Sequence, residues 1–166
     1  MEMVEHIYQY YQSERNTAIL AGIIGLVLLI GSFAFFQFNV SDKLIKGLTY
    51  VFLIAGLFFL IAGVLVTIHN NSKMEETKNF TNTNSELQQS EIKRMKSVLS
   101  TGYRSALILF STLVITGLIL ILLNPNNLLK GIALGLLIIG TIGHTTEVFS
   151  MQKNKVYQQK INSINF

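Results

Sequence analysis

The sequence predicts an all-α integral membrane protein, a four-helix bundle made of two similar transmembrane hairpins with a cytoplasmic amphipathic helix between them. Only 13% of its residues are charged, whereas a soluble domain carries about 25%. The shortfall is concentrated in four apolar runs, each close to the roughly 20 residues that cross a bilayer as a helix. A polar insert, 70–104, separates the first two runs from the last two. The expected spans are 17–38, 47–68, 105–123 and 128–149.

One membrane domain, 1–166, is the natural organisation for these runs. The runs are apolar on every face, whereas the strands of a membrane barrel alternate apolar and polar residues. The chain contains no cysteine, so no disulfide or cysteine metal site is available. Residues 1–14 contain three glutamates and no Lys or Arg. A signal peptide starts with a positive region, so we expect the first span to remain as an anchor.

The basic residues predict the orientation. Ten of the 13 Lys and Arg lie in the termini and the insert, and the other three, Lys43, Lys46 and Lys130, lie in the hairpin loops. The positive-inside rule then places both termini and the insert in the cytoplasm. Arg15 and Arg104, which precede spans one and three, are expected to contact lipid headgroups. This placement favours membrane lipids rather than nucleic acid as the partner of the basic excess.

Both ends of the chain carry apolar stripes at helical spacing. Residues 1–14 place Val4, Ile7, Tyr8 and Tyr11 three or four apart, and 151–166 repeats the pattern with Tyr157, Ile161 and Ile164. Such stripes are typical of helices that lie on the membrane surface. We therefore expect interfacial segments at 1–14 and 151–166, with a frayed tail as the alternative for the first.

The insert contains a predicted amphipathic helix at 85–101. Its apolar stripe, with charged residues such as Glu91 and Arg94 around it, is a candidate surface for binding a partner. Nothing between Ser85 and Tyr103 forces a stop except Gly102, so this helix can run straight into span three. The candidate partner-binding residues are Leu87, Ile92, Met95 and Leu99.

Small residues mark the expected contacts between spans. In span two, Gly56 and Gly63 are seven residues apart and share a face. In span four, Gly131 and Gly135 form a G-x-x-x-G arrangement. Segments 44–48 and 128–132 both contain Lys-Gly at a helix start, which indicates a duplicated two-helix unit related by a pseudo-twofold axis along the membrane normal. Alternatively, Lys-Gly is simply a common way to start a span.

Three titratable residues near the cytoplasmic ends of spans two and four are candidates for an ion or proton site. His144 and Glu147 share one helix face, and His69 completes a two-His, one-carboxylate set. The alternative is that all three lie in the headgroup zone, where polar residues cost little. The sequence has no nucleophile elbow or phosphate loop, and the midplanes of the spans carry no charge. We therefore expect neither enzymatic activity nor a cofactor.

The segment Glu91-Ile-Lys-Arg94-Met95-Lys-Ser-Val98 resembles the E-x-x-R-M-x-x-V stretch of some small four-helix bacterial membrane proteins of unassigned function. The resemblance implies the fold and a bacterial inner membrane, and it implies no activity. Together these patterns favour a protein that binds another membrane protein or a second copy of itself. An accessory subunit and a toxin-immunity protein both fit. The alternative is a small oligomeric channel or transporter that uses His69, His144 and Glu147.

Overall fold

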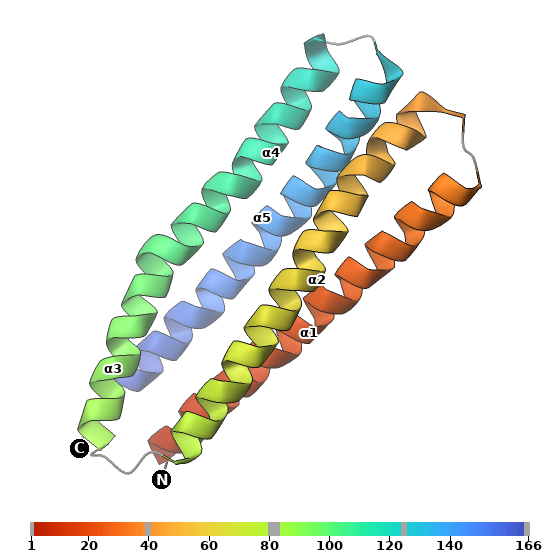
Figure 1. Ribbon diagram of the computed structural model, residues 1–166. Helices are drawn as coiled ribbons and strands as arrows, with labels where there is room; N and C mark the ends of the chain where they lie inside the picture. The colour runs from red at the N-terminus through yellow and green to blue at the C-terminus, as the bar shows by residue number, and fades with distance from the viewer. Residues whose placement is uncertain (1, 39–40, 80–83, 124–125, 165–166) are drawn as a thin grey trace.

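The computed structural model describes residues 2–38, 41–79, 84–123 and 126–164, and within these ranges it contains helices and no strand. Four long helical segments run side by side and alternate in direction along the chain (Figure 1). The elements are α1 (Glu2–Gln37), α2 (Lys43–Lys78), α3 (Asn84–Ser97), the π-helical turn η1 (Val98–Gly102), α4 (Tyr103–Leu123) and α5 (Asn127–Asn162). The prediction of an all-α fold is confirmed.

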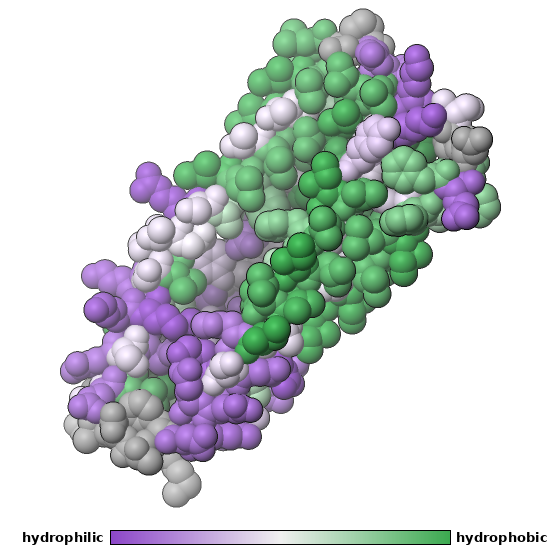
Figure 2. Space-filling model, viewed as in Figure 1, coloured by the Kyte–Doolittle hydropathy of each residue, from purple (hydrophilic) through white to green (hydrophobic). Residues whose placement is uncertain are grey.

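Four helical segments are long and apolar enough to cross a membrane, as the sequence predicts. Their apolar side chains gather at one end of the molecule, and hydrophilic side chains gather at the other (Figure 2). We call the described parts of 17–38, 47–68, 105–123 and 128–149 the apolar half. The polar cap consists of residues 2–16, 69–78, 84–102 and 150–164.

Side-chain caps start α2 and α5 in the same way. The backbone N–H of Leu44 donates a 2.8 Å hydrogen bond to the side chain of Asp42, and that of Leu128 donates a 2.9 Å bond to Asn126. Each cap satisfies a backbone donor that the first turn of a helix leaves unpaired. Both helices therefore begin at the same distance before their Lys-Gly pairs.

Small residues set the helix spacing in the apolar half, where α1 packs along α2, α2 against α5, and α4 along α5. A Cβ atom on Gly63 would lie 2.7 Å from the carbonyl oxygen of Ala18, and one on Gly56 would lie 2.9 Å from that of Gly25. On α5, a Cβ on Gly135 would lie 2.7 Å from the side chain of Val51. These glycines allow the backbones to approach as small residues do in membrane helix pairs.

Parallel helices α2 and α5 cross at a reciprocal glycine contact. A Cβ on Gly47 would overlap the carbonyl oxygen of Leu128, and a Cβ on Gly131 would overlap that of Leu44. The two glycines, 47 and 131, are 84 positions apart, and so are the two leucines, 44 and 128. Residues that are 84 positions apart in the two helices thus pack around the same crossing point.

Buried positions in α2 recur every seven residues along its whole length, at Thr49, Gly56, Gly63, Asn70 and Thr77. This heptad spacing is typical of long helices that supercoil around one another. The spacing continues from the apolar half into the polar cap, so the same face of α2 is buried in both parts of the molecule.

The expected surface segments are not separate elements. α1 runs unbroken from Glu2 to Gln37 and α5 from Asn127 to Asn162, while α2 continues past His69 to Lys78. Residues 1–14 and 151–166 therefore extend the spans instead of lying across them, as far as the structure describes them. The other helices of the cap cover their apolar stripes. This packing removes the apolar side chains from water as well as a membrane surface would.

The π-helical turn joins α3 to α4 without a break, and it contains one extra residue. In α4 the buried positions Tyr103, Phe110 and Gly117 are seven apart, but the step from buried Met95 to Tyr103 is eight. The corresponding step in α1, from Tyr11 to Ala18, is seven. A π turn absorbs one inserted residue locally, so α3 and α4 both keep their buried faces.

Candidate functional site

The polar cap has its own core, made of side chains from α1, α2, α3 and α5. Ile7, Tyr11, Met74, Met95 and Ile161 are among its buried members. Polar groups cover this core on the outside (Figure 2). The cap is therefore a short four-helix bundle continuous with the apolar half.

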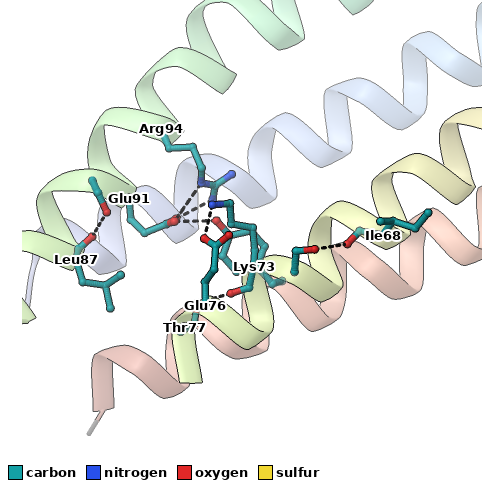
Figure 3. A network of polar contacts seen from close by, with 10 residues as sticks. Ile68, Lys73, Glu76, Thr77, Leu87, Glu91 and Arg94 are labelled. Carbon is teal, nitrogen blue, oxygen red and sulfur yellow. Dashed lines mark hydrogen bonds and ion pairs between the residues drawn. The ribbon is translucent and has the colours of Figure 1, made fainter. Parts of the chain in front are cut away.

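Glu91 on α3 is the centre of the cap. The residue is 7% exposed in total. It accepts a 2.8 Å hydrogen bond from the Tyr11 hydroxyl of α1 and a 3.3 Å bond from the Tyr157 hydroxyl of α5. Arg94, one turn later on α3, forms a 2.8 Å ion pair with the same carboxylate (Figure 3). Four donor atoms from three helices thus converge on one carboxylate.

Aromatic rings enclose the Glu91–Arg94 pair. The Tyr10 and Tyr157 rings stack with centroids 3.9 Å apart. The Arg94 guanidinium lies 4.9 Å from the centroid of the Tyr11 ring and 5.3 Å from that of Tyr10, which is the range of cation–π attraction. The guanidinium therefore has an anionic partner at one side and π faces at another.

Burial and the nearby charge of Glu91 raise the pKa of the Tyr11 and Tyr157 hydroxyls well above their usual range. Both groups lie in the polar cap, outside the apolar half. They remain protonated at neutral pH, so each can donate to the carboxylate. A buried carboxylate costs little when donors satisfy it and much when they are removed. The arrangement therefore fastens α1, α3 and α5 to one another.

Sequence reasoning placed Glu91 beside the apolar stripe, on the charged side. The structure buries it between Leu87 and Met95, each four residues away on the same face. The spacing was a visible signal, because residues four apart on a helix share a face. The hydroxyl groups that donate to Glu91 come from other helices, so the sequence around Glu91 does not reveal them.

The predicted partner-binding stripe is used within the chain. Leu87 is 6% exposed and Met95 is 1% exposed in the core of the cap, and Ile92 and Leu99 pack against that core. The expectation of a free binding face on this helix is therefore not met. The physical reason is that α1, α2 and α5 extend far enough beyond the apolar half to cover the stripe.

The three residues of the predicted ion site are not gathered. No group of three His, Asp or Glu side chains within the described ranges is placed to hold a metal ion, and all three candidates lie in those ranges. His69 is exposed, while His144 and Glu147 are half-buried. The Nδ1 atom of His144 lies 3.3 Å from the Ser111 hydroxyl. His144 thus contacts α4 from α5, a role in helix packing.

A layer of buried polar groups lies where the cap meets the apolar half. Asn154 of α5 is 1% exposed, and Asn70 of α2 is 4% exposed. The Asn154 amide nitrogen donates to the Tyr103 hydroxyl. Three buried atoms have no hydrogen-bond partner among the described residues, namely Arg15 Nε, Asn70 Nδ2 and Asn154 Oδ1. Sequence reasoning missed both asparagines.

The two arginines that were expected to contact lipid headgroups differ in how exposed they are. Arg104 is exposed, as a headgroup contact requires. Arg15 is half-buried, and its Nε atom is covered by other residues.

Among the small residues predicted to pack, Gly56, Gly63, Gly131 and Gly135 are all buried against neighbouring helices.

Comparison of the chain with models of known protein families, with curated proteins and with solved structures found no match.

Proposed function

We propose that the chain is a non-enzymatic, four-span protein of a bacterial inner membrane that acts by binding another membrane protein or a second copy of itself. The polar cap, with both ends of the chain, would face the cytoplasm. The positive-inside rule supports this orientation, because ten of the 13 basic residues belong to the termini and the insert. An accessory subunit and an immunity protein that blocks a membrane-inserting toxin both fit this role.

The two halves of the chain would be duplicated transmembrane hairpins. The reciprocal contact of Gly47 and Gly131 supports this, because a twofold axis between α2 and α5 exchanges them. Buried residues 84 positions apart also correspond: Gly56 with Gly140 and Asn70 with Asn154. The equivalent caps at Asp42 and Asn126 extend the match to the helix starts. Both hairpins would enter from the cytoplasm, so the axis would run along the membrane normal.

The α3 stripe is buried inside the cap, and this burial supports our proposal about where a partner binds. With Leu87 and Met95 buried, the large apolar surface left is the outside of the apolar half. Val27 of α1 and Leu65 of α2 are each 62% exposed. In a membrane such side chains face lipid or another helix. We place the partner surface there, in addition to the membrane lipids themselves.

The channel or transporter alternative depended on His69, His144 and Glu147 acting together. Among the described residues, no group of three His, Asp or Glu side chains is placed to hold a metal ion, so the structure adds no support to this alternative. We therefore keep a single proposed function.

Site-specific photo-crosslinking in cells tests the proposal. A benzoylphenylalanine at Val27 or Leu65 should give protein adducts of discrete mass, and the same group at Ile92 should give none between chains, because Ile92 packs inside the cap. Two differently tagged copies expressed together would identify a self-adduct. Adducts only with lipid at every outward position of the apolar half would contradict the proposed role.

A further inference from the structure

We infer that α2 and α5 hold one phospholipid between them, in the leaflet beside the polar cap. The two parallel helices touch near their starts, where Gly47 and Gly131 cross, and they lie farther apart beside the cap (Figure 1). The space that opens between them is apolar at one end and polar at the other, as a phospholipid is. This inference goes beyond the proposed binding of a partner protein, and neither depends on the other.

Exposed fractions along the facing sides of α2 and α5 show where the two helices part. Near the crossing, a Cβ on Gly135 of α5 would lie 2.7 Å from Val51 of α2. Residues seven positions apart lie on the same side of a helix, because seven residues make about two turns. Seven residues after these two positions, Phe58 is 54% exposed and Ile142 is 59% exposed. The helices therefore no longer cover each other at this level.

One series of positions on α5 shows that the opening closes again at the cap. Ile139, Thr146 and Lys153 follow one another at intervals of seven residues, on one side of the helix. Ile139 is 8% exposed, and Thr146 is exposed. Lys153 donates hydrogen bonds to Ser13 and Glu14 of α1. This side of α5 is thus buried, then open, then covered by α1. We call the open stretch between α2 and α5 the window.

The length and lining of the window fit an acyl chain. From Ile139 to Phe149, the end of the apolar half, α5 rises by about 15 Å. That is half of the roughly 30 Å hydrocarbon core, which is the depth of one leaflet. Phe149 of α5 is 67% exposed, and Val66 of α2 is 44% exposed. A helix of a second chain would cross the full core, and the contact of Gly47 with α5 closes that path between α2 and α5.

Polar side chains lie at the cap end of the window. His69 of α2 and Lys153 of α5 are 84 positions apart, the same separation as at the crossing, so they lie at about the same height. His69 is exposed, and the Lys153 side chain is 46% exposed. A lysine ammonium has three donors, and Ser13 and Glu14 accept from two of them. The third donor and the His69 ring can bind the oxygens of a lipid phosphate.

Native mass spectrometry of the full chain tests the window. Protein extracted in mild detergent from vesicles of dioleoylphosphatidylglycerol and dioleoylphosphatidylethanolamine should retain one phospholipid per chain. Thr146→Trp should lose it, because the indole takes the place of the acyl chain. Thr141→Trp is the matched control and should keep the lipid. Thr141 is also exposed, but it lies about 140° away around α5.

Three results would overturn the inference. A wild-type chain without retained lipid would show that the window holds none. Equal retention by the two tryptophan variants would place the lipid elsewhere on the protein. A dimer that Thr146→Trp dissociates would assign the window to a second copy of the chain. Circular dichroism checks that both variants keep the helical content of the wild type.

Thermal unfolding provides a second measurement that needs no bulky substitution. Dioleoylphosphatidylglycerol added to delipidated protein in detergent should raise the Tm to a plateau, because a ligand of the folded state stabilises it. His69→Ala should need about fivefold more lipid for half of the rise, which corresponds to the loss of one hydrogen bond. Asn71→Ala, at an exposed position nearby, should behave as the wild type does. An unchanged midpoint in His69→Ala would contradict the proposed headgroup contact.

Discussion

The hydroxyl of Tyr11 donates a 2.8 Å hydrogen bond to Glu91, a carboxylate 80 residues later in the chain. Glu91 also accepts bonds from Tyr157 and Arg94. The polar cap thus depends on one buried anion that α1, α3 and α5 share. The first prediction concerns the loss of that anion.

Glu91→Ala should destabilise the cap by about 3–5 kcal/mol, because it leaves the Arg94 guanidinium and two tyrosine hydroxyls without their acceptor. The control is Glu86→Ala, which removes an exposed carboxylate from the same helix and should change the free energy of unfolding by less than about 0.5 kcal/mol. Chemical unfolding in mild detergent measures both. Equal effects of the two substitutions would mean that the Glu91 network contributes no stability.

Glycine packing between α1 and α2 gives the second prediction. Gly56→Leu combined with Gly63→Leu should lower the thermal stability by roughly 3 kcal/mol or more, because each side chain would enter the backbone of α1. Gly31→Leu is the matched control, since a Cβ at Gly31 meets no atom within 4 Å. Wild-type stability of the double variant would show that this face points to lipid.

The π-helical turn at 98–102 gives a prediction about a deletion. Removing Ser100, an exposed residue of the turn, should convert it to an α-helix and cost less than about 1 kcal/mol, because one residue is extra there. Removing Thr112, exposed in the middle of α4, should be far more damaging, because every later side chain would rotate by about 100°. Expression level and Tm compare the two deletions. If both are equally harmful, the turn does not hold an inserted residue.

Orientation in the membrane gives the fourth prediction. Reporter fusions after Asp42 and after Ser163 should report opposite sides, with Ser163 in the cytoplasm, because the basic residues are concentrated near the ends of the chain and in the insert. A fusion within the described part of the cap, after Lys78, should agree with Ser163. The same side for Asp42 and Ser163 would end the four-span arrangement.

The four apolar helices could be predicted because the composition of a span is a local property of the sequence. The covering of the apolar stripes in the cap by other helices could not be predicted. The stripe of Ile7 and Tyr11 looks the same whether a membrane surface or other helices cover it, and the structure shows that helices do. Glu91 looked like a solvated charge because its partners, Tyr11 and Tyr157, lie 80 and 66 residues away.

The bond between Tyr157 and Glu91 has a consequence for biosynthesis. Tyr157 follows the fourth apolar segment, so the cap cannot close until the last helix has left the ribosome. Until then, the apolar face that α1 carries at Ile7 and Tyr11 must be shielded by lipid or by a chaperone. Emergence of α5, rather than insertion of the first hairpin, is therefore the step that allows the cap to close.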